Sequence, residues 1–157
     1  MSILPSRERI AFLYRTDRGE IDRATWRSGA LGLLAVLIPA TIIWFLLEPY
    51  TIHDLSKSPF WVPQTAAAYA YVIFYAFIVI LAAISFANLS AKRFRARGLK
   101  APLTLAGLVP LAAFLAGAAH FFQPRLADLF SRWSVYPFDL ALIGVAAWTL
   151  YELGWRE

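Results

Sequence analysis

Residues 90–100, SAKRFRARGLK, carry five positive charges within nine residues, and long apolar stretches lie on both sides. Such a cluster can bind a nucleic acid, or it can keep a loop on one side of a membrane. The flanking stretches favour the membrane, because a bilayer core about 30 Å thick requires roughly 20 apolar residues in a helix. Four stretches fit this length: residues 28–47, 65–89, 102–122 and 137–153. The sequence therefore predicts an all-α, integral membrane four-helix bundle forming a single membrane domain over residues 1–157.

The composition supports this class. Hydrophobic residues make up 60% of the 157 residues, whereas a soluble domain usually has roughly 45–50% apolar residues. The first three stretches contain no Asp, Glu, Lys or Arg, and the shorter fourth has Asp139 and Glu152 near its two ends. There is no cysteine, which excludes disulfides and thiolate metal sites.

The positive charges predict how the chain is threaded. Twelve of the fifteen Lys and Arg residues precede residue 28, lie between residues 90 and 101, or follow residue 153. Loops rich in Lys and Arg stay in the cytoplasm. Both termini are therefore expected in the cytoplasm, with residues 90–100 as a short cytoplasmic loop and with the loops 48–64 and 123–136 outside.

The segment 1–27 is predicted to be a cytoplasmic interfacial segment. Ile10, Leu13 and Tyr14 share one face with arginines around them, which predicts a short N-terminal amphipathic helix lying in the plane of the interface. Asp22 is placed to cap the helix that leads into the first span.

Basic groups beside an anionic membrane surface contribute roughly 1 kcal/mol each to lipid binding. Arg23 and Trp26 share a helix face, so that the guanidinium reaches phosphate while the indole lies at the interface. No aromatic platform beyond Phe94 accompanies the basic residues, and a nucleic acid partner is not expected. The residues predicted to bind lipid headgroups are Arg23, Trp26, Lys92, Arg93, Arg95, Arg97 and Lys100.

Two fragments carry a family resemblance. Residues 19–26, GEIDRATW, resemble a G-R-[IL]-x-R-x-x-[FY]-W segment, and residues 92–98, KRFRARG, resemble R-R-L-H-D-x-G. In this order they are similar to the bacterial inner-membrane family catalogued as domain of unknown function 805, over roughly residues 10–115. Arg95 and Ala96 stand where that family has a His-Asp pair. The resemblance implies a multi-pass protein of the bacterial cell inner membrane and no established reaction.

Residues typical of catalysis or metal binding are sparse. The two histidines, His53 and His120, have no Cys or His-x-x-x-His motif beside them, so no metal and no cofactor is expected. Ser85 and Ser90 have no histidine or carboxylate predicted within reach, and the chain is predicted not to be an enzyme. The spans also lack ionisable groups at mid-depth, which argues against active transport.

Small residues at four-residue spacing, such as Ala113 and Gly117, let helix backbones approach closely. They serve either contacts within the chain or docking to another membrane protein. The leading hypothesis is therefore a non-enzymatic accessory or scaffold subunit that packs against partner membrane proteins, or against its own copies, and against anionic lipid. The alternative is a small oligomeric transporter or channel for a hydrophobic or anionic solute, with Pro39 and Pro110 as flexible points. An enzyme acting on lipid is a third hypothesis.

Overall fold

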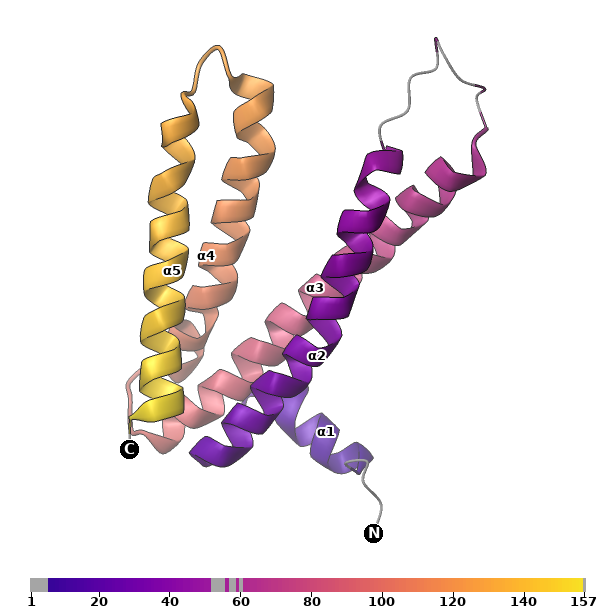
Figure 1. The fold of residues 1–157 in the computed structure, drawn as a ribbon. Coiled ribbons are helices and arrows are strands. Elements are labelled where there is room, and N and C mark those ends of the chain that lie inside the picture. The colour runs from indigo at the N-terminus through magenta and orange to yellow at the C-terminus, as the bar shows by residue number, and fades with distance from the viewer. Residues whose placement is uncertain (1–5, 52–55, 57–58, 60, 157) are drawn as a thin grey trace. The chain divides into compact units, whose positions relative to one another are not determined.

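The computed structural model describes residues 6–51, 56, 59 and 61–156. His53 lies outside the described residues. Within them the elements are helical, without a strand, and four segments are long and apolar enough to cross a membrane. The long helices are α2 (Arg23–Leu47), α3 (Pro63–Ala96), α4 (Pro102–Phe122) and α5 (Tyr136–Leu150) (Figure 1). The all-α class and the four apolar helices are confirmed.

Shorter helices precede or follow the long ones. They are α1 (Arg7–Tyr14), the 3-10 turns η1 (Glu48–Thr51), η2 (Gln123–Leu126) and η3 (Arg132–Val135), and the π-helical turn η4 (Tyr151–Trp155). Asp22 caps α2 as predicted, because its Oδ1 accepts a hydrogen bond from the backbone N–H of Thr25 at 3.1 Å.

The predicted loop over residues 90–100 is wrong for most of its length, because α3 continues to Ala96. The chain turns away two residues after the end of α3, at Gly98, whose φ of +67° favours glycine. The N–H of Gly98 donates to the carbonyl of Arg95 at 2.8 Å, and that of Leu99 donates to the carbonyl of Phe94 at 3.1 Å. This is the Schellman arrangement that closes a helix with a left-handed residue. The basic residues therefore lie at fixed angles around the last turns of a helix.

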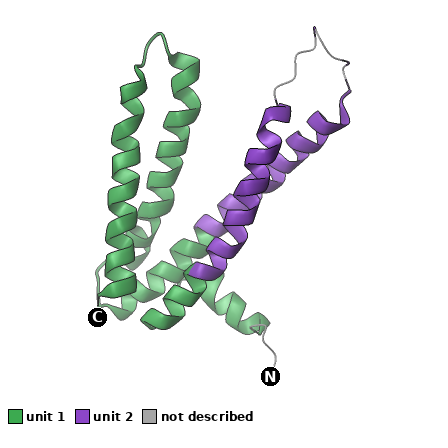
Figure 2. Cartoon of the chain, viewed as in Figure 1, with its two compact units in different colours: residues 1–30, 84–157 green, residues 31–83 purple. Residues whose placement is uncertain are grey.

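The chain divides into two compact units, residues 31–83 and the remainder (Figure 2). In the unit of residues 31–83, the facing surfaces of α2 and α3 are mostly apolar, and a few hydroxyl groups form hydrogen bonds between them. The hydroxyl of Tyr71 donates to the carbonyl of Ala40 at 2.7 Å, and the hydroxyls of Thr41 and Tyr75 lie 2.9 Å apart. Satisfying these groups within the protein is what an apolar surrounding requires.

The unit of residues 1–30 and 84–157 has a buried core drawn from most of its helices. Its members are Leu13, Ile21, Trp26, Leu89, Ala91, Phe94, Ala106 and Leu153. The predicted short N-terminal helix is present as α1, and its Leu13 is buried in this core. Gly29 lies against Leu89, since a Cβ at Gly29 would fall 2.9 Å from a methyl carbon of that leucine. The glycine is therefore needed for the close approach of α2 and α3.

Many large apolar side chains on the four long helices are exposed in the isolated chain. Phe114 is 71% exposed, Leu140 69% and Leu46 67%. Apolar surface on this scale is rare in soluble monomers, whereas lipid covers it in a membrane. The four long helices therefore fit a membrane protein in their surface as well as in their length.

Candidate functional site

The basic residues of α3 lie on two faces of its last turns. Lys92 and Arg95 bind the segment that follows α1, whereas Arg93 and Arg97 bind the chain around η4. Residues three or four apart share a helix face, so this division follows from the helical geometry that the loop prediction missed.

Lys92 is completely buried, and its ammonium is surrounded by backbone carbonyls. It donates to the carbonyls of Leu13 and Asn88 at 3.2 Å each, and to that of Thr16. Three acceptors match the three donors of an ammonium group. The carbonyls at the end of α1 have no helical partner of their own, and a cation there is also favoured by the helix dipole. Lys92 therefore holds the end of α1 against α3.

Two more side chains reinforce this attachment. The side-chain amide of Asn88 donates to the carbonyl of Tyr14 at 2.9 Å. Arg95 donates to the carbonyls of Asp17 at 2.5 Å and Gly19 at 2.9 Å. Burial raises the pKa of Tyr14, whose hydroxyl donates to the carbonyl of Gly29 at 3.1 Å. The N-terminal segment is thus bound by hydrogen bonds to both α2 and α3.

On the other face of α3, Glu152 is the buried acceptor of two guanidinium groups. Glu152 as a whole residue is 4% exposed to solvent. Its Oε1 lies 3.0 Å from Nη2 of Arg97, and its Oε2 lies 3.1 Å from Nη1 of Arg156. Nη1 of Arg97 also donates to the carbonyls of Glu152 and Arg156, each at 3.0 Å. The buried carboxylate is therefore paired with two cations, as burial of a charge requires.

Three further arginines bind the same turn. Arg23 donates to the carbonyl of Trp155 at 3.2 Å, and Arg93 reaches that of Arg156 at 3.5 Å. Arg27 donates to the carbonyl of Gly154, and its guanidinium lies 5.3 Å from the ring centroid of Trp155. Most acceptors here are neutral carbonyls rather than carboxylates.

We name this set the arginine cluster: Arg23, Arg27, Arg93, Arg97 and Arg156, gathered around Glu152. Asp22 adds a second carboxylate, which interacts with Arg93. Hydrogen bonds from the side chain and backbone of Thr25 hold the pKa of Asp22 below its usual value. Among the residues that the structure describes, two carboxylates face five guanidiniums, so this part of the arginine cluster has an excess of positive charge.

The structure brings most of the predicted headgroup-binding residues together, but it places two of them in the interior. Trp26 is 2% exposed, and its indole N–H donates to the hydroxyl of Ser90 at 3.2 Å. Lys92 is buried among carbonyls, whereas Lys100 is exposed beyond the end of α3. Headgroup binding by these residues stays a prediction.

Sequence reasoning missed two contacts. The first is the pairing of Glu152 with Arg97 and Arg156, for which the i,i+4 spacing of Glu152 and Arg156 was the available signal. The second joins α4 to α5, where Nε2 of His120 lies 3.0 Å from Oδ1 of Asp139. No group of three or more potential metal ligands occurs in the part of the chain that the structure describes.

No family model, curated protein or solved structure matches this chain. The similarity to the family catalogued as domain of unknown function 805 therefore stays a prediction from the two fragments.

Proposed function

We propose that the protein is a non-enzymatic, multi-pass membrane accessory subunit whose arginine cluster binds the phosphate of anionic lipid headgroups. The carrying observation is the gathering of five guanidiniums around η4, where the described part of the chain supplies two carboxylates. Arginine matches phosphate geometry with paired hydrogen bonds. Several of these donors now face neutral carbonyls, and a charged acceptor forms hydrogen bonds roughly twice as strong.

The proposed binding residues form a rim around the buried ones. Four arginines of the cluster contact the headgroup, with Arg95 and Lys100 beside them: Arg23, Arg27, Arg93 and Arg97. Lys92 and Trp26 position this rim by fixing α1 and α2 to α3, which their buried contacts support.

The proposed threading places both termini and the arginine cluster on the cytoplasmic side of the bacterial inner membrane. The support is the asymmetry of charge, since twelve of the fifteen Lys and Arg residues fall on that side. Anionic lipids of the cytoplasmic leaflet would then face the cluster directly.

Docking of a partner membrane protein is proposed at α4. A Cβ added at Gly117 would meet no atom within 4 Å, and Ala113, one turn before it, is exposed. A small-residue face of this kind is typical of helix association in membranes.

Lipid retention in native mass spectrometry tests the proposal. Protein extracted in mild detergent would be titrated with phosphatidylglycerol and with phosphatidylcholine. At about 1 kcal/mol per arginine, the double variant R23Q/R27Q is expected to bind phosphatidylglycerol about 30-fold more weakly. R18Q, an exposed arginine outside the cluster, is the matched control and should bind as the wild type does. Equal retention of both lipids by the wild type would refute the headgroup site. A separate measurement on the protein in liposomes tests the transporter alternative, which solute flux would favour.

A further inference from the structure

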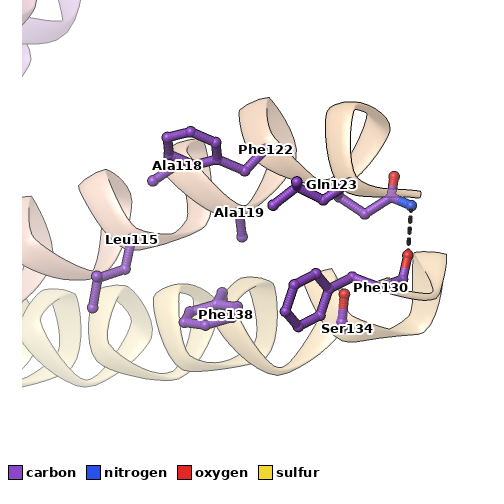
Figure 3. Close-up of a pocket in the computed structure, with 9 residues that line it drawn as sticks. Leu115, Ala118, Ala119, Phe122, Gln123, Phe130, Ser134 and Phe138 are labelled. Atoms are coloured by element: carbon purple, nitrogen blue, oxygen red, sulfur yellow. Dashed lines mark hydrogen bonds between the residues drawn. The ribbon is translucent and has the colours of Figure 1, made fainter. Parts of the chain in front are cut away.

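A cavity of about 290 Å³ lies between the last turns of α4 and the first turn of α5 (Figure 3). Apolar side chains make up most of its wall. The lining residues are Leu115, Ala118, Ala119, Phe122, Gln123, Leu126, Phe130, Ser134 and Phe138. Figure 3 shows Leu115 toward one end of this lining and Gln123, at the end of α4, toward the other.

The end near Gln123 is polar. The side-chain amide of Gln123 donates to the carbonyl of Phe130 at 3.3 Å, so this amide already has a partner. Ser134 also lines this end, and its hydroxyl donates to the carbonyl of Ser131 at 2.7 Å. The cavity is therefore apolar along its length, and the two polar side chains at this end already have hydrogen-bond partners.

Two arginines neighbour the lining residues of this end in the sequence. Arg125 lies in η2 between the lining residues Gln123 and Leu126, and its guanidinium stacks 3.7 Å from the ring centroid of Phe121. Arg132 begins η3 and is exposed; among the residues that the structure describes, its side chain has no hydrogen-bond or ion-pair partner. Asp128 is the only carboxylate between residues 123 and 135. The segment between α4 and α5 therefore carries two guanidiniums and one carboxylate, and the next carboxylate along the chain, Asp139, lies 3.0 Å from Nε2 of His120.

We propose that this cavity binds the chain of a long-chain fatty acid, with the carboxylate at Arg132. The volume lies at the lower end of the range of small-molecule pockets, roughly 300–1,000 Å³, which suits a length of one acyl chain rather than the two tails of a phospholipid. The candidate span that contains α4 ends at Leu126, and the one that contains α5 begins at Arg132. The acyl chain would thus lie along these two spans. Its carboxylate would lie at the membrane surface, beside Arg132.

Charge, rather than the hydrophobic effect, sets the selectivity of this site. Lipid tails are as apolar as the cavity wall, so an acyl chain gains little from leaving them. A guanidinium–carboxylate pair adds charge-assisted hydrogen bonds, but Arg132 is exposed, and a pair in contact with water is worth about two- to fivefold in affinity. A fatty acid is therefore expected to bind about two- to fivefold more tightly than the alcohol of equal length.

A photoreactive palmitic acid with a diazirine in its chain tests the proposal on the full-length protein in lipid nanodiscs. Labelled positions would be mapped by mass spectrometry, with unlabelled palmitic acid and hexadecanol as competitors. Labelling is expected between residues 115 and 138, and palmitic acid should compete about two- to fivefold better than hexadecanol. A119F places a ring in the cavity and should lower labelling about tenfold or more, whereas A147F, at an exposed position of α5 outside the lining, should not. R132Q should make the two competitors equal.

Three results would overturn the proposal: labelling spread evenly over the four helices, equal competition by the two compounds in the wild type, or wild-type labelling of A119F. Circular dichroism checks that each variant keeps its helix content, and the exposed Arg132 provides a variant that does not disturb the core. The arginine cluster takes no part in this site, so a failure here leaves the headgroup proposal untouched.

Discussion

Replacing Glu152 with glutamine is expected to destabilise the protein, because this carboxylate is the buried partner of two guanidiniums. The side chain of Glu152 is 5% exposed, that of Arg97 is 11% exposed, and their charged atoms lie 3.0 Å apart. Removing one member of a buried pair costs about 3–5 kcal/mol. Glutamine keeps the size of the side chain and one acceptor, which reduces this loss.

The second partner contributes less. The side chain of Arg156 is 58% exposed, and water replaces most of the interaction of an exposed pair, which is worth about 0–1 kcal/mol. We therefore expect Glu152→Gln to lower the free energy of unfolding by about 2–3 kcal/mol, nearly all of it through Arg97.

The assay is unfolding of the purified protein in mild detergent by titration with SDS, followed by circular dichroism. A double-mutant cycle with Arg97→Gln isolates the pair, and its coupling energy is expected to be about 2–3 kcal/mol. Glu20→Gln, at an exposed position near the start of α2, is the control. A change below about 0.5 kcal/mol for Glu152→Gln, or additive effects of the two substitutions, would refute the role given to this pair.

Three further predictions follow from the contacts. Lys92→Met leaves the carbonyls at the end of α1 without donors and should lower the free energy of unfolding by about 2–3 kcal/mol. Hydrogen exchange in residues 6–19, measured by mass spectrometry, should become faster, and unchanged exchange would contradict this prediction. Gly29→Ala should lower the free energy of unfolding by about 1–3 kcal/mol, because the added methyl overpacks the contact with Leu89. Gly117→Ala has open space around it and should raise that free energy by up to about 1 kcal/mol through helix propensity. SDS titration compares the two variants, and a more stable Gly29→Ala variant would contradict the packing. Because the pKa of Asp22 is lowered in the folded state, its contribution to stability is present above the unfolded carboxyl pKa of about 4. This contribution is lost as pH falls through the pKa of Asp22 in the folded protein. The free energy of unfolding would be measured against pH for the wild type and for Asp22→Asn, and identical profiles would show that Asp22 does not contribute to the pH dependence.

The helices could be predicted where apolar length and proline agree. Residues 102–122 coincide with α4, because Pro102 suits the first turn of a helix and the apolar run ends two residues before Pro124. The end of α3 was missed, because Lys and Arg are good helix formers and a positive cluster does not stop a helix. Gly98 stops it instead, through its backbone conformation.

The candidate site was only partly predictable, because much of it is built from backbone groups. The partners of Lys92 are the carbonyls of Leu13, Thr16 and Asn88, and a carbonyl leaves no signature in the sequence. The charge of the basic residues is evident from the sequence. Their division between two faces of α3 requires the helix to continue to Ala96, and the prediction ends it at residue 89. Headgroup binding and the family resemblance stay predictions.

Side-specific labelling tests the central claim that the arginine-rich end of this membrane protein lies in the cytoplasm. The chain has no cysteine, so single cysteines can be introduced at the exposed positions Ala96, at the end of α3, and Ser131, between α4 and α5. A membrane-impermeant maleimide applied to intact spheroplasts is expected to label S131C at once and A96C only after lysis. Labelling of A96C in intact spheroplasts, or labelling of both positions from the same side, would contradict the account.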